Sequence, residues 1–156
     1  MRWLGGGKSQ ANGAAFETAF EIICNQNGFS WLRIPNACRQ IGKNSDGSPK
    51  LIRRKSPFDY LIANKGFSAN IDCKSTEGKT WEYSDNDPDQ IRELMNMRGD
   101  MLGGYIIHHP KLDLITFHDV LVLNKMRPRE SLQPSEGIIL GTFGYKCDLH
   151  LLKVHR

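Results

Sequence analysis

Apolar positions recur with a helical spacing near the start of the chain. The pattern predicts an amphipathic helix over residues 13–26, with one apolar stripe formed by Phe16, Ala19, Phe20, Ile23 and Cys24. Asn12 is a suitable N-cap, and the dipeptide Asn27-Gly28 is typical of a helix end. Residues 1–11, which include Gly5-Gly6-Gly7-Lys8, are expected to form a flexible arm.

Three strands are predicted after this helix. Residues 29–34 form the first, which Pro35 ends, and residues 58–63 and 67–74 form the next two. Asn64-Lys65-Gly66 between the last two is typical of a hairpin turn, so these strands should be antiparallel neighbours. The intervening residues 36–56 are rich in Gly, Ser, Pro and basic residues and are expected to form a loop, with a short strand at 50–54.

The second half of the chain continues the alternation of helices and strands. A helix is predicted from Asp87, with Pro88 at its first position, to Gly99. Strands at 104–108 and 112–117 and a short helix at 119–125 follow, whereas residues 126–156 show no clear pattern. Because no repeat or linker divides the chain, we expect a single α/β domain over residues 1–156.

The composition is that of an ordinary globular protein. Its 156 residues are 39% hydrophobic and 24% charged, which argues against a disordered chain or a disulfide-rich miniprotein. With no long apolar segment and no leader sequence, a cytoplasmic protein of a bacterial, archaeal or phage-infected cell is expected. The four cysteines show no C-x-x-C spacing and are expected to be reduced and mostly buried.

Positive charge is concentrated in one segment. Residues 33–55 have a net charge of +6, against +4 for the whole chain, because they hold one acidic residue, Asp46, and seven basic residues: Arg33, Arg39, Lys43, Lys50, Arg53, Arg54 and Lys55. Such a cluster is either a solvated face or a surface that binds a phosphate backbone. Lys8 in the N-terminal arm is a further candidate for phosphate contact.

The two hairpin strands place acidic and basic side chains together. Since side chains alternate along a strand, Asp72 and Lys74 project from one face and Ile71 and Cys73 from the other. Asp59 lies on the neighbouring strand. A surface ion pair is the simplest interpretation, but a carboxylate next to apolar positions in a central strand needs a partner or a metal.

Two carboxylates on adjacent strands favour a Mg²⁺ site completed by the Cys73 carbonyl and water. With Lys74 beside it, this set can support metal-assisted hydrolysis of a phosphodiester. Glu17, at the edge of the apolar stripe of the first helix, is a candidate third carboxylate. Gln90 is a candidate contact for substrate or water, although Asp87-Pro88-Asp89-Gln90 also matches a D-x-x-Q capping box, the interpretation that we favour.

Four ordered strings resemble the motifs of the PD-(D/E)xK nuclease superfamily: Asn12-Gly13-Ala14-Ala15-Phe16-Glu17, Ser56-Pro57-Phe58-Asp59, Ile71-Asp72-Cys73-Lys74-Ser75-Thr76 and Gln90. They are most similar to Holliday junction resolvases of the archaeal and RecU-like kinds, and the resemblance spans about residues 9–123. The D-C-K-S-T string is similar to the archaeal enzymes. Lys79-Thr80 and Gln90 are more RecU-like, and Lys79 is taken as a DNA-binding candidate.

The resemblance implies a restriction-endonuclease-like core, a mixed sheet flanked by helices. It also implies a homodimer that nicks two opposed strands of a four-way junction with Mg²⁺, for which Mn²⁺ can substitute. Glu17, Asp59 and Asp72 match the metal ligands, Lys74 matches the catalytic lysine and Gln90 supports it. In RecU-like enzymes a projecting segment enters the junction, and residues 39–55 occupy the corresponding place.

The chain departs from the family pattern at two positions. Phe58 separates Pro57 from Asp59, and the second acidic residue is Asp72, where many relatives carry Glu. Two alternatives stay open: a nuclease of this superfamily that cuts duplex DNA in restriction or repair, and a non-catalytic nucleic-acid-binding module.

Overall fold

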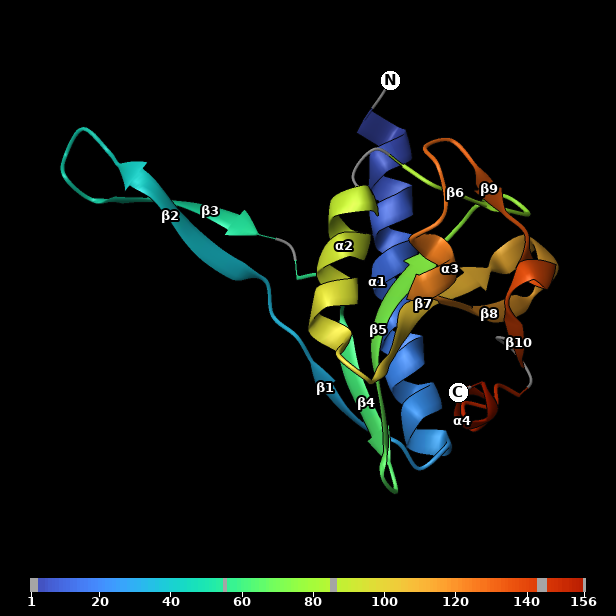
Figure 1. Cartoon of the computed structure of the whole chain (residues 1–156). Helices are drawn as coiled ribbons and strands as arrows, with labels where there is room; N and C mark the ends of the chain where they lie inside the picture. The colour runs from blue at the N-terminus through green and yellow to red at the C-terminus, as the bar shows by residue number, and fades with distance from the viewer. Residues whose placement is uncertain (1–2, 55, 85–86, 143–145, 156) are drawn as a thin grey trace.

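A computed structural model gives the fold of the chain (Figure 1). It describes residues 3–54, 56–84, 87–142 and 146–155, without the side chains of 3–12, 37–39 and 52–54. The predictions for Lys55 and for the side chains of Lys8, Arg39, Arg53 and Arg54 therefore lie outside the described residues. In the part of the chain that is described, no helix is both long and apolar enough to cross a membrane.

A six-stranded mixed sheet forms the centre of the molecule, in the order β1-β4-β5-β7-β8-β10. Its strands are β1 (Ser30–Arg33), β4 (Tyr60–Asn64), β5 (Phe67–Ser75), β7 (Leu102–His109), β8 (Leu114–Asp119) and β10 (Ile138–Gly141). β5 and β7 are parallel, and the other neighbouring pairs are antiparallel. The connection from β5 to β7 crosses one face of the sheet through α2 (Asp87–Arg98).

Helices cover both faces of this sheet. On one face, Phe16, Phe20 and Ile23 of α1 (Trp3–Gln26) pack on Tyr60, Ile71 and other strand residues. On the other face, α2 and α3 (Val120–Leu123) form a second cluster with Tyr105 and Ile107, which also includes residues of β6 (Trp81–Glu82) and β9 (Ser131–Leu132). The predicted mixed α/β sheet flanked by helices is confirmed.

Residues near the end of the chain add to the core on the α1 face of the sheet. Short elements η1 (Pro110–Leu112), η2 (Pro134–Glu136) and α4 (Leu151–Val154) connect or follow the strands. Leu149 and Leu152 are fully buried in the α1 cluster. Cys24 and Cys73 are buried, Cys147 is partly buried, and all three are free thiols, as expected.

Two predictions for the first third of the chain are wrong. α1 begins at Trp3 rather than near Gly13, so residues 3–11 are helical and not an arm, because Gln10, Ala11, Ala14 and Ala15 favour continuation of a nucleated helix. The expected loop at 36–56 is largely a hairpin of β2 (Ala37–Lys43) and β3 (Pro49–Arg54). Figure 1 shows this hairpin projecting from the body.

Candidate functional site: a carboxylate and lysine cluster at the end of the β4–β5 hairpin

The β4–β5 hairpin brings Asp59 next to Asp72. Tyr60 pairs with Ile71, so Asp59 and Asp72 are the next opposing positions beyond the last β4 pair. The Asp59 backbone N–H donates to the Ile71 carbonyl at 2.9 Å. Its Oδ2 accepts a hydrogen bond from the Cys73 backbone N–H at 2.8 Å. The carboxylate of Asp59 thus accepts a hydrogen bond from β5 that a backbone carbonyl would accept if β4 were longer.

Asp72 is fully buried on the same face as Lys74. Its Oδ2 lies 3.0 Å from Lys74 Nζ in an ion pair rather than a well-directed hydrogen bond. Its Oδ1 is buried and has no hydrogen-bond partner among the described residues. A carboxylate oxygen left in this state is costly, so the site has the capacity for one more positively charged ligand.

The electrostatics of the pair are consistent with that capacity. Burial, and then the negative charge of Asp72, raise the pKa of Asp59 to about 7. Burial is the largest single influence on Lys74 and lowers its pKa, but the interaction with Asp72 and the charges of Asp87 and Asp59 together outweigh burial, so the pKa of the lysine is raised. The lysine is therefore a stable cation, while the two carboxylates repel each other until a cation or a proton joins them.

Glu17 approaches this cluster from α1 but has another partner. Its carboxylate forms a close ion pair with Arg33, which also lies 3.8 Å from Glu21 Oε1. Glu17, Arg33 and Asp59 line the same open pocket of about 550 Å³, with residues 34–36. In the described parts of the chain no three or more acidic, histidine or cysteine side chains form a ready metal cage, so Glu17 is near the aspartate pair without completing it.

Gln90 belongs to the cluster, and the favoured capping-box interpretation is wrong. Its Oε1 accepts a hydrogen bond from Lys74 Nζ at 3.0 Å, and its Nε2 donates to the Pro57 carbonyl at 3.3 Å. The carboxylate of Asp87 instead accepts from the backbone N–H and hydroxyl of Ser84, at 2.6 and 2.7 Å. A hydrogen bond from the charged ammonium group of Lys74 is stronger than one from a neutral backbone N–H, which favours this position of the Gln90 side chain.

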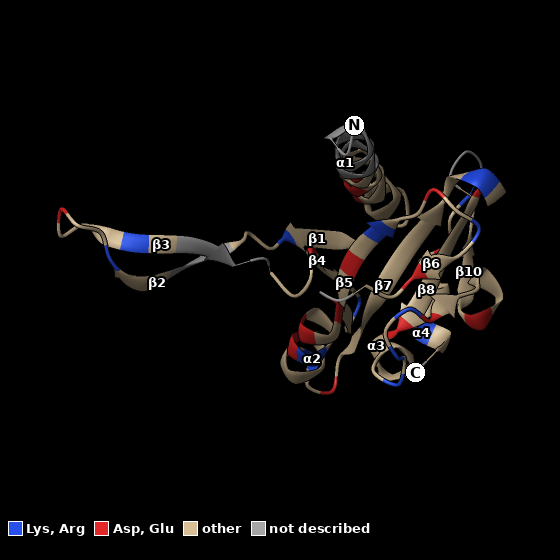
Figure 2. Ribbon diagram, turned by 90° about the horizontal axis from the view of Figure 1, so that it is seen from above, with Lys and Arg blue, Asp and Glu red and all other residues tan. Residues whose placement is uncertain are grey.

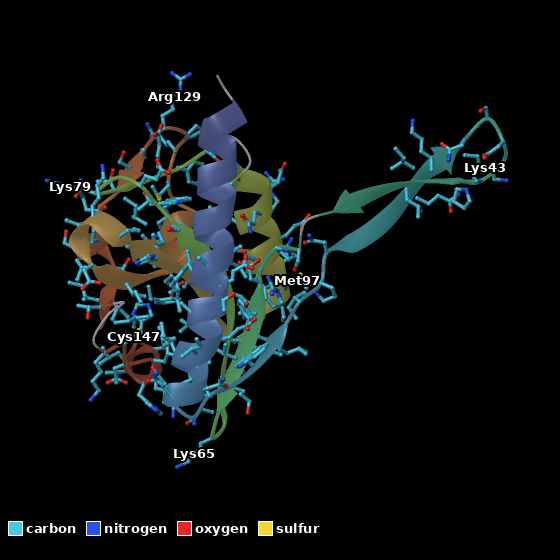
Figure 3. The ribbon with its side chains drawn as sticks, turned by 180° about the vertical axis from the view of Figure 1, so that it is seen from behind. Lys43, Lys65, Lys79, Met97, Arg129 and Cys147 are labelled. Atoms are coloured by element: carbon cyan, nitrogen blue, oxygen red, sulfur yellow. The ribbon has the colours of Figure 1, made fainter. Side chains whose placement is uncertain are left out.

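The basic candidates are spread over the molecule. Lys43 and Lys50 are exposed on the hairpin, and Arg33 is exposed at the end of β1. Lys79, also exposed, lies on the opposite side of the body from the hairpin, as the labels of Lys79 and Lys43 in Figure 3 show. The structure therefore separates Lys79 from the basic segment.

Two residues of the site, Glu21 and Tyr105, were not predicted from the sequence. Glu21 follows Glu17 by one helical turn and accepts a hydrogen bond from the Tyr60 hydroxyl at 2.7 Å, a spacing that was visible in the sequence. Tyr105 lies opposite Asp72 in the parallel β5–β7 register. No local sequence pattern indicates the register of β5 and β7, so the position of Tyr105 beside Asp72 could not be predicted from the sequence.

A divalent metal fits the chemistry of this donor set. Asp59 and the free Oδ1 of Asp72 are hard oxygen ligands of the type that Mg²⁺ prefers. Because the N–H and C=O of one strand residue point to the same side, the carbonyl of Cys73 faces the edge at which its N–H meets Asp59. The carboxylates of Asp59 and Asp72 and the carbonyl of Cys73, together with water, therefore suit a divalent metal.

Comparison with known proteins supports the fold. No family model matches the sequence, and no curated protein does. Among solved structures, the chain is similar to that of Hjc, a Holliday junction resolvase from the archaeal hyperthermophile Archaeoglobus fulgidus, with a TM-score of 0.56 and 17% sequence identity. The similarity covers 81% of this chain and 95% of that chain. The mixed sheet with helices on both faces is thus a fold that this archaeal resolvase shares.

Proposed function

We propose that this protein is a Mg²⁺-dependent endonuclease that resolves four-way DNA junctions by paired phosphodiester hydrolysis. The observation that carries the proposal is the arrangement of Asp59, Asp72 and Lys74 at one end of the β4–β5 hairpin, with an unpartnered buried carboxylate oxygen. The shared fold with an archaeal Holliday junction resolvase supports it.

Asp59, Asp72 and the Cys73 carbonyl would hold the metal, which would supply Lewis-acid polarisation of the phosphate and activation of water. The chain's own residues supply the rest. Lys74, held at Oδ2 of Asp72, leaves Oδ1 for the metal and presents its ammonium group to charge that develops on the phosphate. Gln90 fixes the lysine from the other side.

Arg33 and Glu17 form the rim of the proposed site. They line the pocket that adjoins Asp59, and the side chain of Arg33 is 58% exposed despite its ion pair with Glu17. A guanidinium group in this position can exchange its carboxylate partner for a DNA phosphate, to which it binds in the same forked geometry. Glu17 then becomes available to water or metal at the edge of the site.

A homodimer follows from the proposed substrate. A four-way junction is two-fold symmetric, so paired cuts need two sites related by a two-fold axis. We therefore propose that the protein acts as a homodimer.

The first test compares cleavage of an immobile four-way junction and a linear duplex of matched sequence, each with and without Mg²⁺ and with Mn²⁺ as a substitute. We expect metal-dependent, symmetric nicks in the junction alone. Cleavage of both substrates would support a nuclease but would show that it also acts on duplex DNA and is not specific for the junction. Binding without cleavage under all metal conditions would favour a non-catalytic module.

The Asp72→Asn variant tests the site itself. We expect a folded protein that binds the junction at least as tightly as the original, because a negative charge near the phosphates is removed. Cleavage should fall by at least about 100-fold, since even groups that only support metal ligands are worth about 10- to 100-fold. Asp100→Asn, at an exposed position, is the matched control and should cleave normally. Unchanged cleavage by Asp72→Asn would refute the site.

A further inference from the structure

Tyr105 is a fully buried tyrosine beside the lysine of the proposed site. It lies directly opposite Asp72 in the parallel register of β5 and β7. Lys74 Nζ lies 4.9 Å from the centroid of its ring, within the range of a cation–π contact. The ring of Trp81 packs edge-on against it, with centroids 5.4 Å apart and planes at 86°. Packing thus holds the tyrosine in one orientation.

The hydroxyl of Tyr105 is directed at the side chain that holds Lys74. It lies 3.2 Å from Gln90 Oε1 and 3.4 Å from Asp87 Oδ1. Because Gln90 Nε2 donates to the Pro57 carbonyl, its Oε1 must face the two donors, Tyr105 and Lys74. Burial, and then the charge of Asp72, raise the pKa of Tyr105, so the hydroxyl keeps its proton and acts as a donor.

Asp87 anchors the far end of this chain of contacts. It is 5% exposed, and its second oxygen is held by the backbone N–H and hydroxyl of Ser84. The single proton of the Tyr105 hydroxyl faces two acceptors, the fixed Asp87 Oδ1 and the nearer Gln90 Oε1. Gln90 Oε1 also accepts from Lys74 Nζ, which in turn pairs with Asp72. Of the three N–H donors of Lys74, one faces Asp72 and one faces Gln90, which leaves the third for a substrate oxygen.

We propose that Tyr105 is a positioning residue that orients the ammonium group of Lys74, through its ring directly and through its hydroxyl by way of Gln90. This inference rests on the proposed nuclease function and goes beyond it, because Tyr105 touches neither substrate nor metal. Its consequence is kinetic: loss of the hydroxyl loosens the lysine in the transition state but changes no surface that DNA contacts.

The test is the Tyr105→Phe variant, measured in single-turnover cleavage of a saturating four-way junction with Mg²⁺. Loss of one hydrogen bond of ordinary strength corresponds to roughly a tenfold lower rate constant. The junction Kd should stay close to that of the original protein, and the thermal unfolding midpoint should fall by only a few degrees. Tyr83→Phe is the matched control, because Tyr83 is buried in the same cluster and its hydroxyl makes no hydrogen bond within the described part of the chain. It should cleave at the original rate.

A double-mutant cycle with Gln90→Met separates positioning from general destabilisation. If the hydroxyl acts through Gln90, Tyr105→Phe should cause little further loss in the Gln90→Met background. Two full, multiplicative losses, or an unchanged rate in Tyr105→Phe, would overturn the inference. Gln90 is partly buried, and thermal unfolding of each variant checks that it is folded. The loss of rate in Gln90→Met should equal or exceed that in Tyr105→Phe.

Failure of the inference and failure of the proposed function give different results. If the original protein cuts the junction and the cycle shows no coupling, the nuclease proposal stands and Tyr105 is a core residue only. If the original protein does not cut the junction or a duplex, both proposals fail.

Discussion

At the scale of single residues, a buried polar chain on β7 and β8 stands apart from the candidate site. Thr116 Oγ1 lies 3.0 Å from His109 Nε2 and 2.8 Å from His118 Nε2. Since one hydroxyl carries one proton, it donates to one imidazole and accepts from the other, so the two rings hold opposite tautomers. Both Nδ1 atoms are buried without a hydrogen-bond partner in the described structure. The imidazole that accepts from Thr116 must be neutral, and a proton added to Nδ1 of the other ring would be buried without an acceptor among the described residues.

This arrangement predicts a loss of stability in mild acid. Burial, and then His109, lower the pKa of His118 from 6.5 to about 4. Between these values the unfolded state binds the proton and the folded state does not, so the stability present above pH 6.5 falls as the pH decreases toward 4. From pH 7.5 to pH 5 the expected loss from this residue is about 2 kcal/mol.

The measurement is urea unfolding of the original protein and of His118→Gln at both pH values. Asp59, whose pKa is raised to about 7, acts in the opposite direction, and it cancels because both proteins contain it. The original protein should lose about 2 kcal/mol more than the variant on acidification. Equal losses in the two proteins would show that His118 is not the buried neutral group described.

At the scale of elements, the C-terminal segment is fastened to the end of α1 by one side chain. Asn27 Nδ2 donates to the carbonyl of Cys147, and its Oδ1 accepts from the backbone N–H of Leu149, both at 3.0 Å. Its own carbonyl lies 3.0 Å from His150 Nε2. These bonds position Leu149 and Leu152 in the core that covers the α1 face of the sheet.

Asn27→Ala should therefore destabilise the protein by about 2–3 kcal/mol, because it leaves partly buried backbone groups unsatisfied. In a chain of this size the midpoint of thermal unfolding should fall by roughly 5–10 °C. Asn25→Ala removes one exposed hydrogen bond, to Trp31 Nε1, and should shift the midpoint by much less. Similar shifts in the two variants would mean that the hydrogen bonds of Asn27 to Cys147 and Leu149 contribute little to stability.

The elements with strong local signals were predictable from the sequence. The turn between β4 and β5 and the start of α2 at Asp87 follow local residue preferences, and both agree with the structure within a few residues. β9, β10 and α4 are only two to four residues long. They depend on contacts such as Asn27 with Leu149, more than 100 positions apart, which no local pattern contains.

The same distinction holds for the candidate site. Asp59, Asp72 and Lys74 were predicted to lie together because one hairpin carries all three. Gln90 was ambiguous, since a capping box and a contact with Lys74 use the same spacing, and only the packing of α2 on β5 decides between them. The ion pair between Glu17 and Arg33 joins residues from two elements whose approach the sequence did not reveal.

At the scale of the whole molecule, the β2–β3 hairpin extends well beyond the body, as Figure 2 shows from above. Lys43 and Lys50 are exposed on it, and in the described part of the chain its two strands pair only with each other. A projecting pair of strands with exposed lysines suits contact with a phosphate backbone without any change in the core.

Replacing Lys43 and Lys50 with glutamine should weaken junction binding and make its salt dependence shallower. If each lysine neutralises one phosphate, the slope of log K against log salt should decrease in magnitude by about 2. The control is a variant with Lys65→Asn and Lys125→Gln, which removes the same charge from exposed positions outside the hairpin. Asn suits the left-handed backbone of Lys65, whose φ is 45°. Equal slopes in the two variants would show that the hairpin does not contact the DNA.

The parallel pairing of β5 with β7 also determines when the candidate site becomes complete during folding. The β4–β5 hairpin is local and can form within microseconds, which places Asp59, Asp72 and Lys74 together early. Tyr105 joins them only after the chain has crossed over through α2 and docked β7, a non-local step that is intrinsically slower. A chain released before that step would carry its acidic residues and lysine in register but without the tyrosine and glutamine that hold the lysine in place.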